Sequence, residues 1–254
     1  MDVLGVKIDE VTMNEALERA ETFFKEDKLH LIFTPNPEII WLAQKNGELR
    51  EALNSADLTL PDGIGVVLAS KILKNPLPER VPGFDFLLEL LKKGHKTFLL
   101  GSAPGVAEQA SQKIPLLRRG GAEHTTCGGD GVVVGEGLAP PSNNIVGTHH
   151  GYFPNSETPS IINKINQSGA ELLVVAMGAP KQELWLYANR NQLNCKVAIG
   201  VGGALDCLAG NVKRAPKIWQ KLYLEWLYRA IKQPKRFIRL LSLPKFLLKV
   251  ITNQ

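Results

Sequence analysis

Hydrophobic and polar positions along the chain repeat one order four times: a short apolar run, a turn rich in glycine or proline, and a longer amphipathic stretch. A fifth apolar run with its turn closes the series. Buried strands that alternate with helices are typical of a parallel sheet whose faces are covered by helices. The pattern therefore predicts an α/β fold with a Rossmann-like, mostly parallel sheet. The five segments are residues 30–46, 56–73, 96–114, 171–193 and 196–210.

The turns after the apolar runs are the candidate ligand site, because parallel α/β sheets bind ligands beyond the carboxyl ends of their strands. They read TPNPE, PDGIG, GSAPG, GAPKQE and GVGG. Their glycines let backbone N–H groups approach a ligand closely, and a helix N-terminus favours phosphate. Taken singly, each glycine is also an ordinary strand-to-helix turn. The residues concerned are Thr34, Asn36, Asp62, Gly101, Ser102, Gly178, Lys181, Gln182, Gly200, Gly202 and Gly203.

Asp62 is the one carboxylate in the turn LPDGIG, between a buried run and a predicted helix. One interpretation is a helix N-cap, since an aspartate there satisfies N–H groups that have no partner within the helix. The other is a general base at the carboxyl edge of the sheet, in apolar surroundings that suit proton transfer. The local sequence supports both equally.

Several classes of chemistry find no support in the motifs. The turns match neither the GxGxxG dinucleotide fingerprint nor the GxxxxGK[ST] phosphate loop, which argues against an oxidoreductase and against ATP hydrolysis. No DxD motif is present, and the adjacent His149 and His150 suit neither helical nor strand spacing of metal ligands. We therefore expect no metal. THHGYF is expected to close a strand and shape the wall of the site.

Cysteine usage and the N-terminal sequence bear on the compartment. The three cysteines stand at unrelated spacings, which suggests a reducing environment. The N-terminal stretch carries acids and no long apolar core, so we do not expect a signal peptide. No run of about 18 uncharged apolar residues exists, so we expect no membrane-spanning helix. These features predict a soluble or peripheral cytosolic protein.

The net charge of +5 is unevenly distributed. Residues 211–254 hold 11 Lys and Arg and one acid, Glu225, whereas the rest of the chain holds 19 basic and 24 acidic residues. A basic tail on an acidic body favours an anionic partner. No nucleic-acid-binding motif accompanies the charge, so we expect no nucleic acid.

The tail interleaves basic residues with Trp, Tyr, Phe and Leu at helical spacing, and Pro234 and Pro244 divide it. Such helices lie in a membrane interface, or they pack as an amphipathic pair that completes the core. For residues 218–226 both interpretations stay open. For residues 237–251, where apolar residues including Phe246 exceed one narrow stripe, we expect contact with lipid.

The motifs TPNPEII, LPDGIGVV, ERVPGFDF, GSAPGVAE, IVGTHHGYF, GAPKQE, GVGGALDCLAGNVKRAP and EWLYRAIKQPKR occur in order across almost the whole chain. Together they resemble the WecG/TagA/CpsF glycosyltransferase family, in particular its wall teichoic acid branch. The resemblance implies a hexosyltransferase that needs no metal or other cofactor. It implies inverting transfer of N-acetylmannosamine from its UDP donor to the C4 hydroxyl of GlcNAc on undecaprenyl diphosphate, at the cytoplasmic leaflet. Another UDP-sugar donor (N-acetylmannosaminuronic acid or glucose), or a non-catalytic lipid-binding module, stays open.

The resemblance also assigns residues. The family's proposed general base falls on Asp62, and its polar donor-site positions fall on Thr34, Asn36, Arg80 and Gln182. A fixed guanidinium at Arg80 suits the charge that develops on departing UDP; the alternative is a surface arginine beside a loop.

The likeness of the tail implies that Arg229, Arg236 and Arg239 meet the lipid diphosphate and that the tail folds over the body to complete the site. Catalysis would then require membrane docking, or dissociation of a soluble homo-oligomer that hides the site. We therefore divide the chain into a catalytic core, 1–210, and a membrane-docking appendage, 211–254. Deletion of the appendage is expected to abolish turnover and leave the core folded.

Residues 115–143 depart from the family pattern. The stretch is rich in Gly and Pro and has no helical periodicity, and Pro115 is expected to end the preceding helix early. An inserted loop and a stretch read in a shifted frame both account for the change in composition. We expect an exposed, poorly ordered loop.

Overall fold

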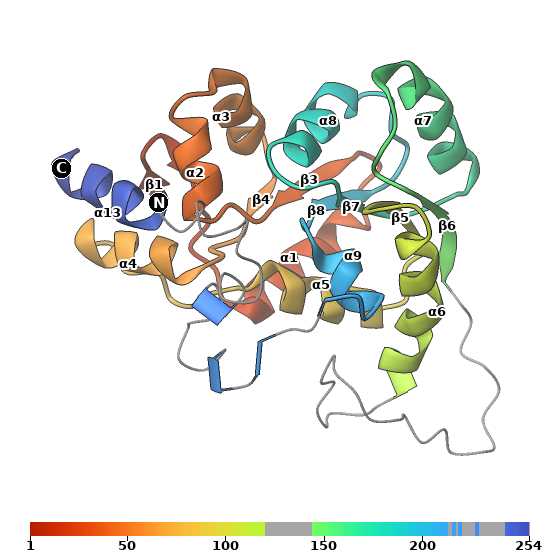
Figure 1. Cartoon of the computed structure of the whole chain (residues 1–254), viewed down its shortest axis with the longest axis horizontal. Coiled ribbons are helices and arrows are strands. Elements are labelled where there is room, and N and C mark those ends of the chain that lie inside the picture. The colour runs from red at the N-terminus through yellow and green to blue at the C-terminus, as the bar shows by residue number, and fades with distance from the viewer. Residues whose placement is uncertain (120–143, 213–214, 217, 220–226, 229–241, 254) are drawn as a thin grey trace.

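The computed structural model describes residues 1–119, 144–212, 215–216, 218–219, 227–228 and 242–253 (Figure 1). Its centre is a six-stranded parallel sheet with the strand order β4-β3-β8-β7-β5-β6. The predicted Rossmann-like α/β fold is confirmed. The strands are β3 (His30–Phe33), β4 (Leu58–Thr59), β5 (Thr97–Gly101), β6 (Ile145–His149), β7 (Leu172–Ala176) and β8 (Val197–Gly200).

Helices cover both faces of the sheet, as Figure 1 shows. The buried side chains form two hydrophobic clusters, one on each face. The helices of the first face are α2 (Pro37–Ala43), α3 (Gly47–Asn54), α4 (Ile64–Ile72), α7 (Thr158–Gln167, after a 3-10 turn at Asn155–Glu157), α8 (Lys181–Asn189) and α13 (Ser242–Thr252). Those of the second face are α1 (Met13–Phe23), α5 (Gly83–Lys92), α6 (Val106–Arg119) and α9 (Ala204–Leu208).

The helices that follow neighbouring strands often lie on opposite faces of the sheet. α9 follows β8 on the second face, whereas α2 and α8, which follow the strands on either side of it, lie on the first. Likewise, α6 follows β5 on the second face, whereas α8 and α7, which follow the neighbouring strands β7 and β6, lie on the first face. Such switches open crevices at the carboxyl edge of a parallel sheet, where ligands bind. This edge is therefore the candidate ligand site.

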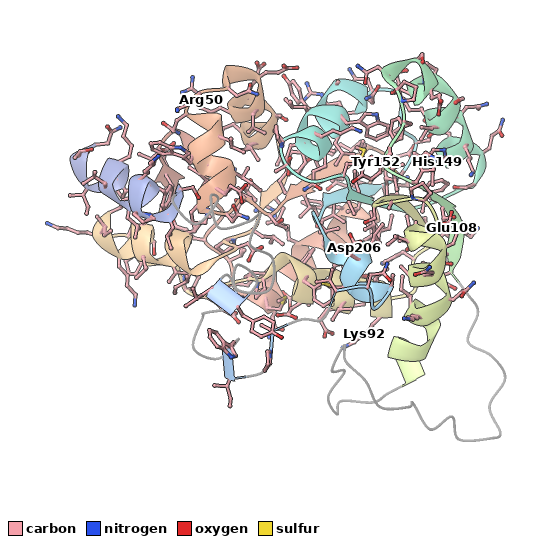
Figure 2. All side chains as sticks on the ribbon, in the orientation of Figure 1. Arg50, Lys92, Glu108, His149, Tyr152 and Asp206 are labelled. Atoms are coloured by element: carbon pink, nitrogen blue, oxygen red, sulfur yellow. The ribbon has the colours of Figure 1, made fainter. Side chains whose placement is uncertain are left out.

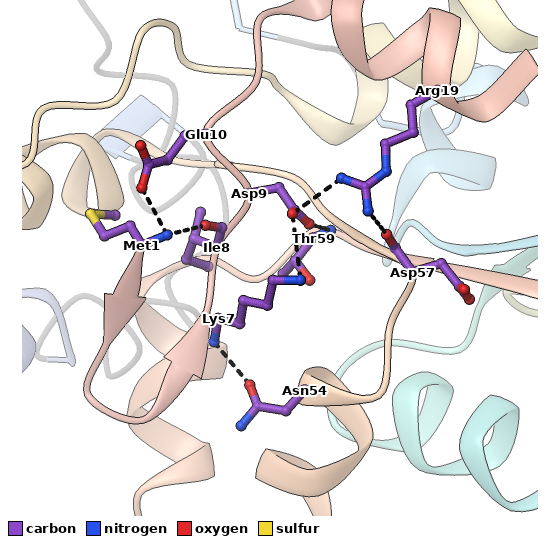
Figure 3. A network of polar contacts seen from close by, with 9 residues as sticks. All are labelled: Met1, Lys7, Ile8, Asp9, Glu10, Arg19, Asn54, Asp57 and Thr59. Atoms are coloured by element: carbon purple, nitrogen blue, oxygen red, sulfur yellow. Dashed lines mark hydrogen bonds and ion pairs between the residues drawn. The ribbon is translucent and has the colours of Figure 1, made fainter. Parts of the chain in front are cut away.

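An N-terminal hairpin, β1 (Asp2–Val3) with β2 (Val6–Lys7), fixes the position of β4. The chain after it places Asp9 so that Oδ2 accepts the N–H of Thr59 at 2.7 Å, while Oδ1 pairs with Arg19 at 3.2 Å (Figure 3). Arg19 also donates to the carbonyl of Asp57 at 2.6 Å. This network holds the short strand β4, which leads into the Asp62 turn.

The C-terminal helix α13 packs against α2 and α4, the helices that begin at the turns after β3 and β4. Phe246 and Val250 are fully buried there, whereas Leu248 and Ile251 are more than half exposed. The expectation that Phe246 faces lipid is therefore wrong, because one apolar stripe of this helix belongs to the core. For Leu248, on the exposed side of this helix, the expected contact with lipid stays a prediction.

Helix α6 does not end at Pro115, as the sequence predicted, but continues to Arg119. Its earlier residues Val106, Ala107, Ala110 and Ile114 are buried in the cluster on the second face. Helical stability in proteins comes mainly from packing of such a stripe, so the anchored helix continues past a proline that lacks one hydrogen bond. Residues 120–143 of the atypical stretch lie outside the described part of the chain. Among the described helices, none is long and apolar enough to cross a membrane.

Candidate active site

Thr34 marks the centre of the site, in the crevice between β3 and β8. Its side chain is buried, and Oγ1 donates to the carbonyl of Gly200 at 3.2 Å. The first residue of α5, Gly83, packs directly on Thr34, since a Cβ there would lie 2.6 Å from Thr34 Cγ2. Thr34 thus joins the ends of two strands to the start of a helix, and its exposed fraction of 9% leaves little contact area for a ligand.

Asn36 and Asp62 belong to neighbouring turns that touch. A Cβ added to Gly63 would lie 3.5 Å from Asn36 Cβ. Asn36 is the N-cap of α2, where Oδ1 accepts the N–H of Ile39 at 3.1 Å. The N-cap of α4 is Gly63, which has a positive φ of 84°. Asp62 is therefore not the N-cap residue. It is half-buried and stands in the turn that contacts the Asn36 turn at the carboxyl edge of the sheet.

Arg80 reaches the same turn from the segment between α4 and α5. The N–H of Val81 donates to the carbonyl of Pro61 at 3.1 Å. Arg80 directly precedes the donor residue and Asp62 directly follows the acceptor residue, so the two lie next to this backbone bond. The Arg80 side chain is half-buried. Its contact with a ligand stays a prediction, as does the alternative of an arginine beside a loop.

Gln182 ties together the turns that follow β7 and β8. Its side chain is buried, and Oε1 accepts the N–H of both Gly178, at 3.2 Å, and Gly202, at 3.0 Å. The sequence predicted that glycine N–H groups here face a ligand. For Gly178 and Gly202 those N–H groups are already bonded to Gln182 within the protein. Gly203, at the start of α9, is exposed.

Ser102, which the sequence analysis named as a candidate, pairs with Asp206, which it did not identify. Ser102 follows β5 with a φ of +57°, a conformation that is uncommon for non-glycine residues and that Leu4 and Lys74 also adopt in this chain. Its Oγ donates to Oδ2 of Asp206 on α9 at 2.9 Å. The preceding Gly101 has no room for a side chain, because a Cβ would overlap the backbone of Ala176. The one feature of the sequence that could have indicated Asp206 is that it is a single acidic residue in the first helical turn after GVGG.

Tyr152 belongs to the turn after β6, which contacts the turn that carries Ser102. The N–H of Gly151 donates to the carbonyl of Ser102 at 2.9 Å, which brings the turn after β6 next to the turn after β5. Tyr152 follows directly and is 73% exposed (Figure 2). An exposed aromatic ring at this edge is suited to stacking on a planar base.

THHGYF closes a strand, as expected: β6 ends at His149. His149 Nδ1 lies 2.8 Å from the carbonyl of His150, and its ring meets Phe153 edge-on. Lys181 donates to the carbonyl of Gly151 at 2.9 Å and lies over the Phe153 ring. These contacts build the wall at the β6 end of the site.

Other sequence predictions have no structural counterpart yet. Arg229, Arg236 and Arg239 lie outside the described residues. Within the described ranges, no group of three or more His, Cys, Asp or Glu is arranged to hold a metal ion. The absence of a cofactor therefore stays a prediction.

The fold and this edge define a doubly wound α/β protein with a ligand site at the carboxyl ends of its strands. The chain belongs to the glycosyl transferase WecG/TagA/CpsF family, whose profile matches residues 1–254, and it is a glycosyltransferase. It is 36% identical over 260 residues to proteins of Staphylococcus aureus strains MRSA252, MW2 and NCTC 8325 / PS 47. The alignments cover 98% of this chain and 91% of each relative. These relatives are named N-acetylglucosaminyldiphosphoundecaprenol N-acetyl-beta-D-mannosaminyltransferase.

Proposed function

We propose that the protein transfers N-acetylmannosamine from UDP-N-acetylmannosamine to the C4 hydroxyl of GlcNAc-diphosphoundecaprenol, a step in building the wall teichoic acid linkage unit. The observation that carries the proposal is the convergence, on one edge of the sheet, of polar residues from six separate turns. The names of the relatives supply the acceptor and the transferred sugar. We propose the same substrates for this chain.

Asp62 is the general base of this reaction. Its half-buried carboxylate, beside Asn36 and clear of the N-cap position, takes the proton of the acceptor C4 hydroxyl. The freed oxygen attacks the anomeric carbon as the bond from that carbon to the UDP oxygen breaks. A single displacement of this kind inverts the anomeric configuration.

Arg80 and the turns around Thr34 receive the leaving group. Negative charge grows on the β-phosphate as UDP departs, and a guanidinium held by its surroundings stabilises phosphate oxygens in a bidentate arrangement. The bond between Val81 and Pro61 keeps Arg80 next to the Asp62 turn, where this charge develops. Base and leaving-group partner thus lie on the same part of the edge.

The nucleoside lies at the other end, over Ser102, Asp206 and Tyr152. A carboxylate already oriented by the Ser102 hydroxyl accepts hydrogen bonds from the vicinal hydroxyls of a ribose. The exposed Tyr152 ring stacks on the uracil. The diphosphate then spans the crevices between β5 and β3.

The lipid acceptor places the enzyme at the cytoplasmic face of the membrane, as a peripheral protein. The basic residues of the 211–254 segment supply attraction to anionic lipid, on the order of 1 kcal/mol for each charge near the surface. Arg229, Arg236 and Arg239 are the residues proposed to meet the lipid diphosphate.

The deciding experiment measures UDP release with UDP-N-acetylmannosamine and a short-chain GlcNAc-diphosphoryl lipid, in EDTA. We expect acceptor-dependent release by the wild type and its loss in Asp62→Ala. Parallel reactions with UDP-glucose and UDP-N-acetylmannosaminuronic acid test the donor. Release that is equally fast in the variant, or that occurs only with another donor, would contradict the proposal.

A further inference from the structure

Glu183 is a buried carboxyl group at the edge of the site that the proposed mechanism does not use. It stands in the first turn of α8, directly after Gln182, and is 1% exposed. Buried acids are uncommon in proteins unless they are paired. Its contacts show what it does there.

The two oxygens of Glu183 have different surroundings. Oε1 accepts a hydrogen bond from Nε2 of Gln182 at 2.8 Å. Oε2 is buried and has no hydrogen-bond partner among the described residues. No Lys, Arg or His of the described chain lies within ion-pair distance of either oxygen. Among the described residues, Gln182 is the one side chain that hydrogen-bonds to this carboxyl group.

The bond to Glu183 completes the set of hydrogen bonds that orient the Gln182 amide. Its carbonyl oxygen faces the N–H groups of Gly178 and Gly202, and its nitrogen lies 3.0 Å from where a Cβ of Gly200 would stand. A reversed amide would turn its NH2 group against two N–H donors, and would leave them buried without an acceptor. The N–H groups of Gly178 and Gly202 on one side and the acceptor Glu183 Oε1 on the other together stabilise the observed orientation.

We propose that Glu183 is a positioning residue: by orienting the Gln182 amide, it holds the turns after β7 and β8 at the spacing that the nucleotide donor requires. The inference rests on the proposed function for the identity of that ligand. These turns border the central crevice, where α8 and α9 leave on opposite faces of the sheet. A shift between them changes the shape of the site without removing any group that touches the donor.

Burial raises the pKa of the Glu183 carboxyl, against the lowering effects of its hydrogen bonds from Gln182 and from its own backbone. The charged neighbours on the packed elements point elsewhere. Lys181 donates to Gly151, and Tyr187 of α8 donates to Glu51 of α3. The strand β8 carries no titratable side chain. Glu183 therefore acts as a neutral acid over a wider pH range than a surface glutamate.

The first test compares Glu183→Leu with Glu183→Gln. Leucine is of similar size but offers no acceptor, so we expect UDP to bind roughly tenfold more weakly, the loss of one hydrogen bond of ordinary strength. Glutamine keeps an acceptor for the Gln182 amide and carries no charge, so it should restore the affinity to within about threefold. The KM for the lipid acceptor should stay unchanged in both variants.

Asn189→Leu is the matched control. Asn189 is also buried on α8, and its side chain donates to the carbonyl of Trp185 within the helix, away from the glycine turns. A general loss of stability in α8 would weaken UDP binding equally in Glu183→Leu and Asn189→Leu, and that result would overturn the proposal. So would an affinity of Glu183→Gln as low as that of Glu183→Leu.

The second test needs no ligand. Because the native carboxyl binds its proton more tightly than the unfolded one, stability from this group is complete below its unfolded pKa of about 4.3 and falls as pH rises through the folded pKa. The Tm of the wild type should therefore fall relative to Glu183→Gln as the pH rises above the unfolded pKa. A constant difference in Tm would overturn the neutral-acid assignment. Failure of the wild type to bind UDP would instead overturn the proposed function.

Discussion

Ser102 and Asp206 are joined across the edge of the sheet by a hydrogen bond of 2.9 Å, although 104 residues separate them in the chain. The serine holds a positive φ of 57°, and its backbone is fixed by bonds to Ala176 and Gly151. A strained residue held this firmly orients its hydroxyl, and the hydroxyl in turn orients the carboxylate. The pair is therefore a preformed acceptor for hydroxyl groups of a ligand.

Asp206→Asn is expected to weaken UDP binding by roughly 10- to 100-fold, the range for hydrogen bonds to a charged group. The KM for the donor should rise with it, while the kcat at saturating donor changes less, because the ribose lies away from the reacting carbon. Titration calorimetry with UDP and steady-state kinetics measure the two effects.

Glu108→Gln is the control for this variant. Glu108 also accepts a hydroxyl hydrogen bond, from Thr148 at 3.0 Å, and it is exposed on α6 (Figure 2). Its substitution should leave the UDP affinity within about twofold of the wild-type value, since an exposed polar pair contributes little to binding or stability. Equal losses in both variants would show that acidity of this face, rather than Asp206 itself, attracts the donor.

Asp62→Asn is expected to lower turnover by about 10²- to 10⁴-fold, the usual contribution of a general base. UDP affinity should change little, because the donor's partners are other residues. The variant does not remove an N-cap from α4, since that position belongs to Gly63. Single-turnover kinetics and UDP titration separate the two; a parallel loss of affinity and turnover would assign Asp62 to donor binding instead.

The sequence predicted the strands and their turns because buried apolar runs and glycine turns are local patterns. Gly101 ends β5 and Val106 begins α6 where the pattern placed them. The pairing of the turns could not be predicted, since the order of strands depends on long-range packing. For this reason the sequence analysis predicted that the N–H of Gly202 faces a ligand, and it did not identify Asp206. The continuation of α6 past Pro115 could not be predicted for the same reason, because it depends on long-range packing of the helix.

Gly65→Ala is expected to destabilise the protein by about 1–3 kcal/mol, the usual effect of overpacking. A Cβ at Gly65 would overlap Pro37 and lie 2.5 Å from Leu243 Cδ1, where α2, α4 and α13 meet. The turns that carry Asn36 and Asp62 would separate, so turnover should fall as well. Urea unfolding and the UDP-release assay measure both effects.

Gly47→Ala is the matched control for Gly65→Ala. Gly47 begins α3, and a Cβ there meets nothing within 4 Å. Alanine should leave turnover unchanged and raise the free energy of unfolding by about 0.4–1 kcal/mol, because the unfolded chain loses freedom. Reduced turnover here would mean that activity responds to any change in the helices of this face.

Phe246→Ala is expected to lower the free energy of unfolding by about 3–5 kcal/mol, because the ring is fully buried between α13, α2 and α4. Leu248→Ser, on the exposed stripe of the same helix, should change it by less than about 0.5 kcal/mol.

Deletion of residues 211–254 removes Phe246 and Val250, so it should also destabilise the core rather than leave it intact. Chemical denaturation of the three variants checks this. If Phe246→Ala proved as stable as Leu248→Ser, α13 would be a detachable part of the tail, and loss of turnover on deletion could be assigned to the missing arginines alone.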